Sequence, residues 1–316
     1  MILTKNDLEK ITFGALRITE SEGKFNFYRF TEEQNAVYDK LTNDFRKKAD
    51  GTASVMLDFY TDSQTLSFSY TTESKAGPLI NYAFIDIWVD GMIIAHVGDY
   101  HNTVRSGEAC ITLPEGEKRV TVYMPSMFAT TLWDITLEDG ASLRPAEKKY
   151  KVLVLGDSIT HGYEGHFPSL NYANTIIREF GLDAVNQAIG GEVFRADILG
   201  TKALFSPDFI TVALGTNDWG GHPDADEYFK KLVELYPDTK IFYISPIWRT
   251  SANDAFYASV EKYEAIAKSY GAEIIHGLDL LHHMPEMFTD GLHPNDLGYT
   301  QYAKNLIKKL NTFGIS

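Results

Sequence analysis

Val152-Leu153-Val154-Leu155-Gly156-Asp157-Ser158 is the stretch that decides the fold of the second half of this chain. Its four consecutive apolar residues predict a strand buried on both faces, which is typical of a parallel sheet covered by helices. The Gly-Asp-Ser that follows indicates a turn at the carboxyl end of this strand. The sequence therefore predicts that the Ser158 hydroxyl is presented at one edge of a sheet.

Downstream of this stretch, apolar runs alternate with helical patterns as far as the C-terminus. Strands are expected at 151–155, 184–187, 208–214, 240–245 and 272–276. Helices are expected near 170–180, 194–204, 224–236, 254–270 and 296–311. Strands that alternate with helices form parallel sheets, because each crossover connection carries a helix across one face. The pattern predicts a three-layer α/β fold.

The first half of the chain has a different pattern, with short alternating runs rich in Val, Thr, Phe and Tyr. Such runs occur at 54–60, 65–70, 84–89 and 119–124, and turns such as Asp90-Gly91 separate them. Period-two alternation of this kind is typical of antiparallel strands, so this half is expected to be an all-β sandwich or jelly roll. A polar, Pro-containing stretch near 140–150 marks the change of pattern, and the expected domains are 1–147 and 148–316.

Composition excludes several classes of partner. The chain has 316 residues, of which 44% are hydrophobic, and a formal net charge of −14, with acidic residues in excess in both halves. No basic face is available to neutralise phosphates, which argues against nucleic acid and anionic membranes as partners. Cys110 is the single cysteine, the start lacks a signal-peptide core, and no apolar run approaches the ~20 residues of a membrane span. A cytoplasmic location is expected for the chain as given, or secretion if a leader has been removed.

Chemically useful residues follow four of the five predicted strands. Ser158 follows the first strand, Gly190-Gly191 the second, Gly215-Thr216-Asn217-Asp218 the third and Trp248 the fourth. Ligands of open parallel sheets bind outside the carboxyl ends of the strands. These residues are therefore expected to meet at one crevice.

The same crevice is expected to receive Asp290-Gly291-Leu292-His293-Pro294. A serine hydroxyl becomes nucleophilic when a base takes its proton, and a carboxylate orients that base. We expect Ser158 to be the nucleophile, His293 the base and Asp290 its carboxylate. The backbone N–H groups of Ser158 and Gly191 and the Asn217 side-chain amide are candidate donors to an oxyanion.

At these residues the chain resembles the SGNH hydrolases, also called GDSL-type esterases. The resembling blocks are Gly156-Asp157-Ser158-Ile159-Thr160, Asn186-Gln187-Ala188-Ile189-Gly190-Gly191, Gly215-Thr216-Asn217-Asp218 and Asp290-Gly291-Leu292-His293-Pro294, in family order. The resemblance covers about 150–312 and implies a flavodoxin-like sheet, the same catalytic trio, and Gly191 and Asn217 as oxyanion donors. Ala188 departs from the glycine that many members carry. The first half is similar, in architecture alone, to the jelly rolls that precede this domain in some carbohydrate esterases.

Further expectations concern single residues. Asp157, Trp219 and Trp248 are candidate substrate contacts, and the loop at 99–102 is a candidate to reach the crevice. His161 is expected to be an exposed helix or loop residue, and His282-His283 to be structural. Because no carboxylate or cysteine accompanies His282-His283 at ligand spacing, no metal is expected there, and no cofactor is expected for the chain.

The leading hypothesis is a serine esterase that removes a short acyl group, acetyl above all, from a hydroxyl of a carbohydrate through an acyl-enzyme. Ester hydrolysis follows from the three side chains, whereas the acetyl-sugar preference rests on the resemblance. Two alternatives stay open. One is a lysophospholipase or acyl thioesterase on the same fold, and the other is a non-catalytic glycan-binding protein. The expected partner is a small-molecule or glycan ester, and the sequence does not define an oligomeric state.

Overall fold

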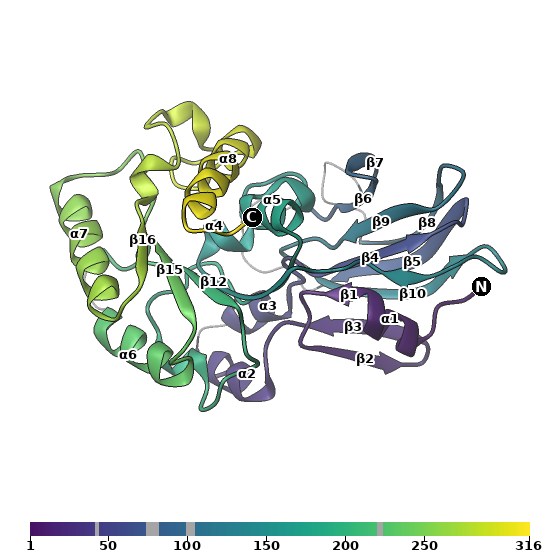
Figure 1. The fold of residues 1–316 in the computed structure, drawn as a ribbon, viewed down its shortest axis with the longest axis horizontal. Coiled ribbons are helices and arrows are strands. Elements are labelled where there is room, and N and C mark those ends of the chain that lie inside the picture. Colours follow the sequence, from purple (N-terminus) through teal and green to yellow (C-terminus); the bar gives the residue numbers. More distant parts are fainter. Residues whose placement is uncertain (42–43, 74–81, 99–104, 220–223) are drawn as a thin grey trace.

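The protein is described by a computed structural model over residues 1–41, 44–73, 82–98, 105–219 and 224–316. The predicted loop at 99–102 lies outside these residues. Figure 1 shows the antiparallel strands of the first half on one side and the parallel sheet of the second half on the other. Two short helices of the first half, α2 (Glu32–Tyr38) and α3 (Asp44–Asp50), lie next to the parallel sheet.

The second half contains a five-stranded parallel sheet with the strand order β13-β12-β14-β15-β16. In order along the chain its strands are β12 (Tyr150–Gly156), β13 (Leu182–Asn186), β14 (Phe209–Ala213), β15 (Lys240–Ile244) and β16 (Glu273–Ile275). Since the second strand along the chain is at the edge and the first lies beside it, this is the flavodoxin-like order 2-1-3-4-5. The predicted three-layer fold is confirmed.

Helices cover both faces of this sheet, which explains why residues 152–155 of β12 are all apolar. Val152 and Val154 pack in one core with α5 and α8, whereas Leu153 and Leu155 pack in another with α6 and α7. The helices are α4 (Ser158–His161), α5 (Tyr172–Phe180), α6 (Ala225–Leu235), α7 (Asp254–Ser269) and α8 (Asp296–Thr312), with 3-10 turns at Pro168–Leu170, Ala196–Leu199, Gly277–Asp279 and Pro285–Met287. Alternate residues of a strand point to opposite faces, so a strand covered on both sides reads as one apolar run.

One predicted helix of the second half is wrong. Residues 194–204 form only the 3-10 turn Ala196–Leu199 in place of an α-helix. No side chain caps the start of this turn, and Gly200 follows it with a φ of +77°. A segment with no cap at its start and a glycine in a left-handed conformation at its end has little to sustain a longer helix.

The first half is built from two antiparallel sheets that share one apolar core, as predicted for a β-sandwich. One sheet has the order β1-β4-β9-β6-β7, with β11 beside β4, and the other has the order β2-β3-β10-β5-β8. The strands are β1 (Thr12–Phe13), β2 (Arg17–Ser21), β3 (Lys24–Tyr28), β4 (Met56–Thr61), β5 (Thr65–Glu73), β6 (Ile85–Val89), β7 (Met92–Val97), β8 (Ser106–Thr112), β9 (Lys118–Tyr123), β10 (Ala129–Leu137) and β11 (Arg144–Pro145).

Three helices of the first half were not predicted by the strand pattern. They are α1 (Lys5–Ile11), α2 (Glu32–Tyr38) and α3 (Asp44–Asp50). Capping boxes begin the first two, with Thr4 paired to Asp7 and Thr31 paired to Gln34. A Thr followed three residues later by an acid or amide is a readable helix-start signal, so these two helices had a local sequence cue.

A buried charge cluster ties the junction between the halves to the first half. The Asp58 carboxylate accepts from Lys148 Nζ at 2.6 Å and from Arg119 Nη2 at 2.6 Å. Burial raises the pKa of Asp58, but the two cations outweigh that effect and hold it below its ordinary value. Met56 and Tyr123 of the first half also pack in a core of the parallel sheet. The boundary at 147/148 stays a prediction.

Candidate active site

Ser158 owes its place to the turn that follows β12. It is the first residue of α4, and the Asp157 carboxylate caps this helix by accepting the Ile159 N–H at 3.0 Å. Ser158 is 4% exposed and Asp157 is 2% exposed. The strand end and the cap together fix the backbone of the serine at the carboxyl edge of the sheet.

The three side chains singled out in the sequence form one hydrogen-bonded chain. His293 Nε2 lies 2.8 Å from Ser158 Oγ, and His293 Nδ1 lies 2.7 Å from Asp290 Oδ2. A carboxylate only accepts, so the ring donates from Nδ1 to Asp290 and accepts the serine hydroxyl at Nε2. This is the tautomer in which an imidazole can take a proton from the serine.

Asp290 is held in its charged form by its own loop. Its other oxygen, Oδ1, accepts the N–H of Leu292 at 2.9 Å and the N–H of His293 at 2.8 Å. Partial burial acts to raise the pKa of this carboxyl, but the hydrogen bonds from His293 and Leu292 together lower it below its ordinary value. The loop therefore supplies a charged carboxylate to the histidine.

The His293 ring is also fixed by an aromatic neighbour. Tyr163 stacks on it, with ring centroids 5.4 Å apart and an interplanar angle of 25°. The same tyrosine presses against Gly190, where an added Cβ would lie 2.4 Å from the ring. Gly190 is therefore a glycine because a side chain there would overlap Tyr163, a reason that the sequence did not reveal.

The segment after β13 leaves one backbone donor available. Gly191 is exposed and has a φ of +84°, and its N–H has no hydrogen-bond partner among the described residues. The neighbouring N–H groups all donate hydrogen bonds of 2.7 to 3.2 Å. Those of residues 187–190 have as acceptors, in order, Val154 O, Asn186 Oδ1, Gly156 O and His161 Nδ1. Those of residues 192–194 have Ile189 O, Glu192 Oε1 and Asp218 Oδ1. An unpaired donor in an otherwise satisfied loop is suited to stabilise an anion.

Asn217 lies beside this donor. Its Nδ2 donates one hydrogen to the carbonyl oxygen of Glu192, the residue next to Gly191, at 2.9 Å. An amide nitrogen carries two hydrogens, so a second one is left for a ligand. The structure thus brings together the two residues that the sequence predicted as oxyanion donors.

The three candidate substrate contacts differ in their surroundings. Trp219 is half-buried under Arg249, whose guanidinium carbon lies 5.5 Å from the ring centroid. Trp248 stacks on His283 at 5.5 Å with an interplanar angle of 8°, so one face of its ring is occupied. Asp157 is buried as the cap of α4, a position that disfavours contact with a substrate. All three contacts stay predictions.

The pKa values of Asp157 and Asp218 are shifted in the direction opposite to that of Asp290. Burial raises the pKa of each to about 7, against the hydrogen bonds that Asp157 accepts from Ile159 and Asp218 from Phe194. The oxygen Oδ2 of Asp218 is buried without a partner among the described residues, which fits a protonated group.

The expectation that His161 is exposed is wrong. The residue is fully buried; its Nε2 lies 3.1 Å from the carbonyl oxygen of Ser126, and its Nδ1 accepts the Gly190 N–H at 3.2 Å. Burial, with Arg29 nearby, lowers the pKa of His161 well below its ordinary value. A neutral ring that donates at Nε2 can accept at Nδ1, so His161 supports the glycine loop.

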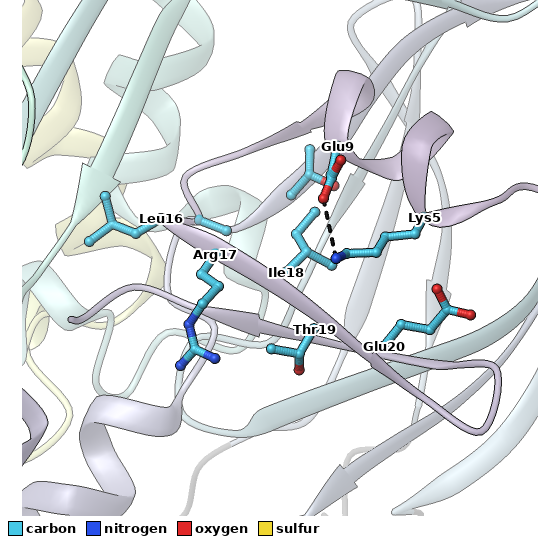
Figure 2. A pocket seen from close by; sticks show the side chains of 9 residues that line it. Lys5, Glu9, Leu16, Arg17, Ile18, Thr19 and Glu20 are labelled. Atoms are coloured by element: carbon cyan, nitrogen blue, oxygen red, sulfur yellow. Dashed lines mark ion pairs between the residues drawn. The ribbon is translucent and has the colours of Figure 1, made fainter. Parts of the chain in front are cut away.

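No cluster of metal-ligating side chains occurs within the ranges that the structure describes. A hollow of about 700 Å³ lies far from the catalytic trio, between α1 and the edge strand β2. Figure 2 shows its lining, in which Lys5 pairs with Glu9 at 3.5 Å and Arg17 points away from that pair. Its mixed charges and separation from Ser158 give no reason to place the chemistry there. Among the described residues, no helix is long and apolar enough to cross a membrane.

The hydrogen-bonded trio can support ester hydrolysis, and the chain is similar to known proteins that act on esters. Residues 154–301 match the model of the GDSL-like Lipase/Acylhydrolase family. Residues 154–301 therefore form a GDSL-like lipase/acylhydrolase domain, and the protein is a hydrolase that acts on ester bonds. No curated protein sequence matches the chain.

Solved structures that resemble the whole chain include the following three. The salicylyl-acyltransferase SsfX3 of a tetracycline biosynthetic pathway has 23% identity and a TM-score of 0.73, with 96% of this chain and 94% of that chain covered. A GDSL-lipase-like protein from Bacteroides ovatus ATCC 8483 has 19% identity and a TM-score of 0.74, with 97% and 96% covered. The acetyl xylan esterase Est2A from Butyrivibrio proteoclasticus has 16% identity and a TM-score of 0.64, with 99% and 96% covered. At these identities the likeness concerns the fold, and it extends over both halves.

The sequence missed the residues that approach the site from the first half. The described part of 29–51 contacts the loop that follows β13 through the side chains of Arg29, Gln34, Tyr38 and Lys48. These contacts span more than 140 positions of the chain and carry no local motif. No periodicity or spacing in one sequence could have identified them.

Proposed function

We propose that the protein is a serine esterase that hydrolyses short-chain acyl esters, acetyl esters above all, on a carbohydrate. The observation that carries this proposal is the hydrogen-bonded chain from Asp290 through His293 to Ser158. A nucleophile, a base in the right tautomer and a charged carboxylate are the parts that an acyl-enzyme mechanism needs.

In the proposed reaction Ser158 Oγ attacks the ester carbonyl carbon while His293 Nε2 takes the hydroxyl proton. Asp290 stabilises the imidazolium that forms, and the N–H groups of Gly191 and Ser158 and the amide of Asn217 bind the oxyanion. Collapse of the tetrahedral intermediate expels the alcohol, which takes the proton from His293. Water, deprotonated by His293, then attacks the acyl-serine and releases the acid.

The carbohydrate part of the proposal is supported by relatives in fold. Est2A is an acetyl xylan esterase, and a family two carbohydrate esterase from Clostridium thermocellum, 14% identical with a TM-score of 0.64, was solved in complex with cellohexaose. Both share the two-part architecture over at least 96% of this chain. A glycan ester is therefore the substrate class to test first.

Acyl transfer to an alcohol is the second candidate, because the salicylyl-acyltransferase SsfX3 shares the architecture of the whole chain. Hydrolysis and transfer use the same acyl-enzyme and differ in whether water or another hydroxyl attacks it. An added acceptor alcohol that accelerates aryl release and yields a new ester would favour transfer. Acetate as the only acyl product would favour hydrolysis.

The test is a series of p-nitrophenyl esters from acetate to palmitate, followed by acetylated xylan, with Ser158→Ala beside the wild type. We expect rapid cleavage of acetate and propionate by the wild type and none above background by the variant. Preference for long chains would replace the proposal with a lysophospholipase or acyl thioesterase. Glycan binding without cleavage of any ester would favour the non-catalytic alternative.

A further inference from the structure

The loop that would bind the oxyanion is held from behind by the first half of the chain. We call residues 186–192 the glycine loop. Arg29, which is fully buried, donates from Nη1 to the carbonyl oxygens of Asn186 and Ala188 in this loop. The same guanidinium donates to Gly51 O at 2.5 Å and to Lys48 O at 3.0 Å. Arg29 therefore joins the glycine loop to the end of α3.

Two side chains of α2 add further contacts. Gln34 and Gln187 pair through their amides, with nitrogen–oxygen distances of 2.8 and 2.9 Å. Tyr38 donates its hydroxyl hydrogen to Glu192 Oε2 at 2.7 Å. The glycine loop is thus bonded near both of its ends to a helix that lies between β3 and β4 in the sequence.

Lys48 acts at the centre of the glycine loop. Its Nζ donates to the carbonyl oxygen of Gly190 at 2.7 Å and lies 3.8 Å from the position that a Cβ of Gly191 would take. Lys48 is half-buried and makes no ion pair within 4.0 Å in the described part of the chain. Its Nζ also lies 5.0 Å from the Phe45 ring centroid, so the Gly190 carbonyl oxygen is the one hydrogen-bond acceptor of this ammonium among the described residues.

The Gly190 carbonyl and the Gly191 N–H belong to one planar peptide unit. In a trans peptide the C=O and N–H bonds point in opposite directions. An ammonium that holds the carbonyl oxygen on one side therefore turns the N–H to the other side, where Gly191 is exposed. A cation on the carbonyl oxygen also polarises the unit and makes its N–H a stronger donor.

We propose that Lys48 is a positioning residue for ester hydrolysis, which orients and polarises the Gly190–Gly191 peptide so that the Gly191 N–H serves the oxyanion. The first half of the chain then completes the catalytic site and is more than an appended binding module. This inference rests on the proposed esterase function for its kinetic consequence. Its structural part, the orientation of one peptide by one side chain, can be measured separately.

The test compares Lys48→Met with Lys47→Met, because Lys47 is the exposed neighbour on the same helix. With p-nitrophenyl acetate we expect Lys48→Met to lower kcat about 10- to 100-fold with KM changed less than threefold, since a donor is misdirected rather than removed. Affinity for a phenylboronic acid, which forms a tetrahedral adduct with a reactive serine, should fall by a similar factor. Lys48→Arg should recover part of the loss, and Lys47→Met should match the wild type.

A second readout separates this proposal from the esterase function. The amide proton and nitrogen signals of Gly191 should shift in Lys48→Met and stay in place in Lys47→Met. Unchanged Gly191 signals, or a kcat within twofold of the control, would overturn the proposal. If melting curves show that Lys48→Met is unfolded, Lys48→Arg decides. A folded Lys48→Arg with partly reduced kcat supports the proposal, and a folded Lys48→Arg with wild-type kcat overturns it. If the wild type cleaves no ester, the proposed esterase function and the kinetic role of Lys48 are both wrong. The Gly191 signals still test whether Lys48 orients the Gly190–Gly191 peptide.

Discussion

The acid–base loop at 290–293 and the glycine loop at 186–192 serve one candidate site, yet they are stabilised in different ways. Asp290 is fixed by two backbone N–H groups within three residues of itself, and it orients His293 in the same turn. The glycine loop depends on Arg29 and Lys48, whose contacts cross 142 to 159 positions of the chain. The difference teaches that one functional loop can be read from a local motif while its counterpart in the same site cannot.

The largest expected effect falls on the acid–base loop. We expect His293→Ala to lower kcat by about 10⁶-fold and Asp290→Asn by about 10⁴-fold, because the first removes the base and the second disturbs its tautomer. Both should melt close to the wild-type temperature, since the loop's other contacts remain. Cleavage of p-nitrophenyl acetate measures the effect, and His276→Ala, an exposed histidine paired with Glu264, is the control. Near-normal kcat in His293→Ala would remove the acid–base loop from the mechanism.

Removing the anchor of the glycine loop should reduce stability as well as activity. Arg29→Met leaves buried carbonyl oxygens without a donor, and we expect it to lower the free energy of unfolding by about 3–5 kcal/mol in urea titrations. Arg17→Met is the matched control, because Arg17 is exposed and pairs with Glu32, a contact worth about 0–1 kcal/mol. If the free energy of unfolding falls by the same small amount in both variants, the contacts of Arg29 do not stabilise the glycine loop measurably.

Asn217→Ala tests the oxyanion side directly. Loss of one such donor should lower kcat by about 10²- to 10³-fold while KM changes little, because the interaction strengthens as negative charge develops. Asn311→Ala, an exposed residue of α8, serves as the control in the same assay. A raised KM at unchanged kcat would instead make Asn217 a substrate-binding residue.

The last expected effect is a change in the slope of stability with pH. The pKa of Asp157 is about 7 in the folded protein, above its ordinary value of 3.8, so the folded state binds more protons between these values. The free energy of unfolding should therefore fall as pH rises from about 4 to about 7, by at most about 1.4 kcal/mol per pH unit for this group. Asp157→Asn keeps a helix cap but has no proton to lose, so its stability should fall less over this window.

Urea titrations of both proteins at several pH values measure this difference. Asp254→Asn, an exposed residue at the start of α7, is the control and should follow the wild-type pH dependence. Asp218 contributes in the same direction as Asp157, so part of the slope should persist in the variant. Identical slopes for Asp157→Asn and the wild type would show that Asp157 is charged in the folded protein throughout.

Most of the parallel sheet was predictable, because a strand covered on both faces contains an apolar run, such as 152–155 of β12, and the neighbouring strands contain similar runs. The wrong helix at 194–204 had helix-like composition, but it lacked a cap and met Gly200. In the first half the four alternating runs correspond to β4, β5, β6 and β9, while the other strands and the capping signals before α1 and α2 were not identified. Boundaries of the predicted strands and helices otherwise agree within about two residues, apart from the longer β5.

The sequence by itself determined the fold class and predicted the Ser158, His293 and Asp290 trio and the two oxyanion residues, because each motif consists of neighbouring residues after a strand. Tertiary structure alone decided that His161 is buried, that Gly190 must accommodate Tyr163, and that Arg29 and Lys48 hold the glycine loop. Local motifs indicate which side chains and backbone groups the proposed reaction needs. The direction of a single peptide N–H depends on what lies behind it, and here those residues come from the other half of the chain.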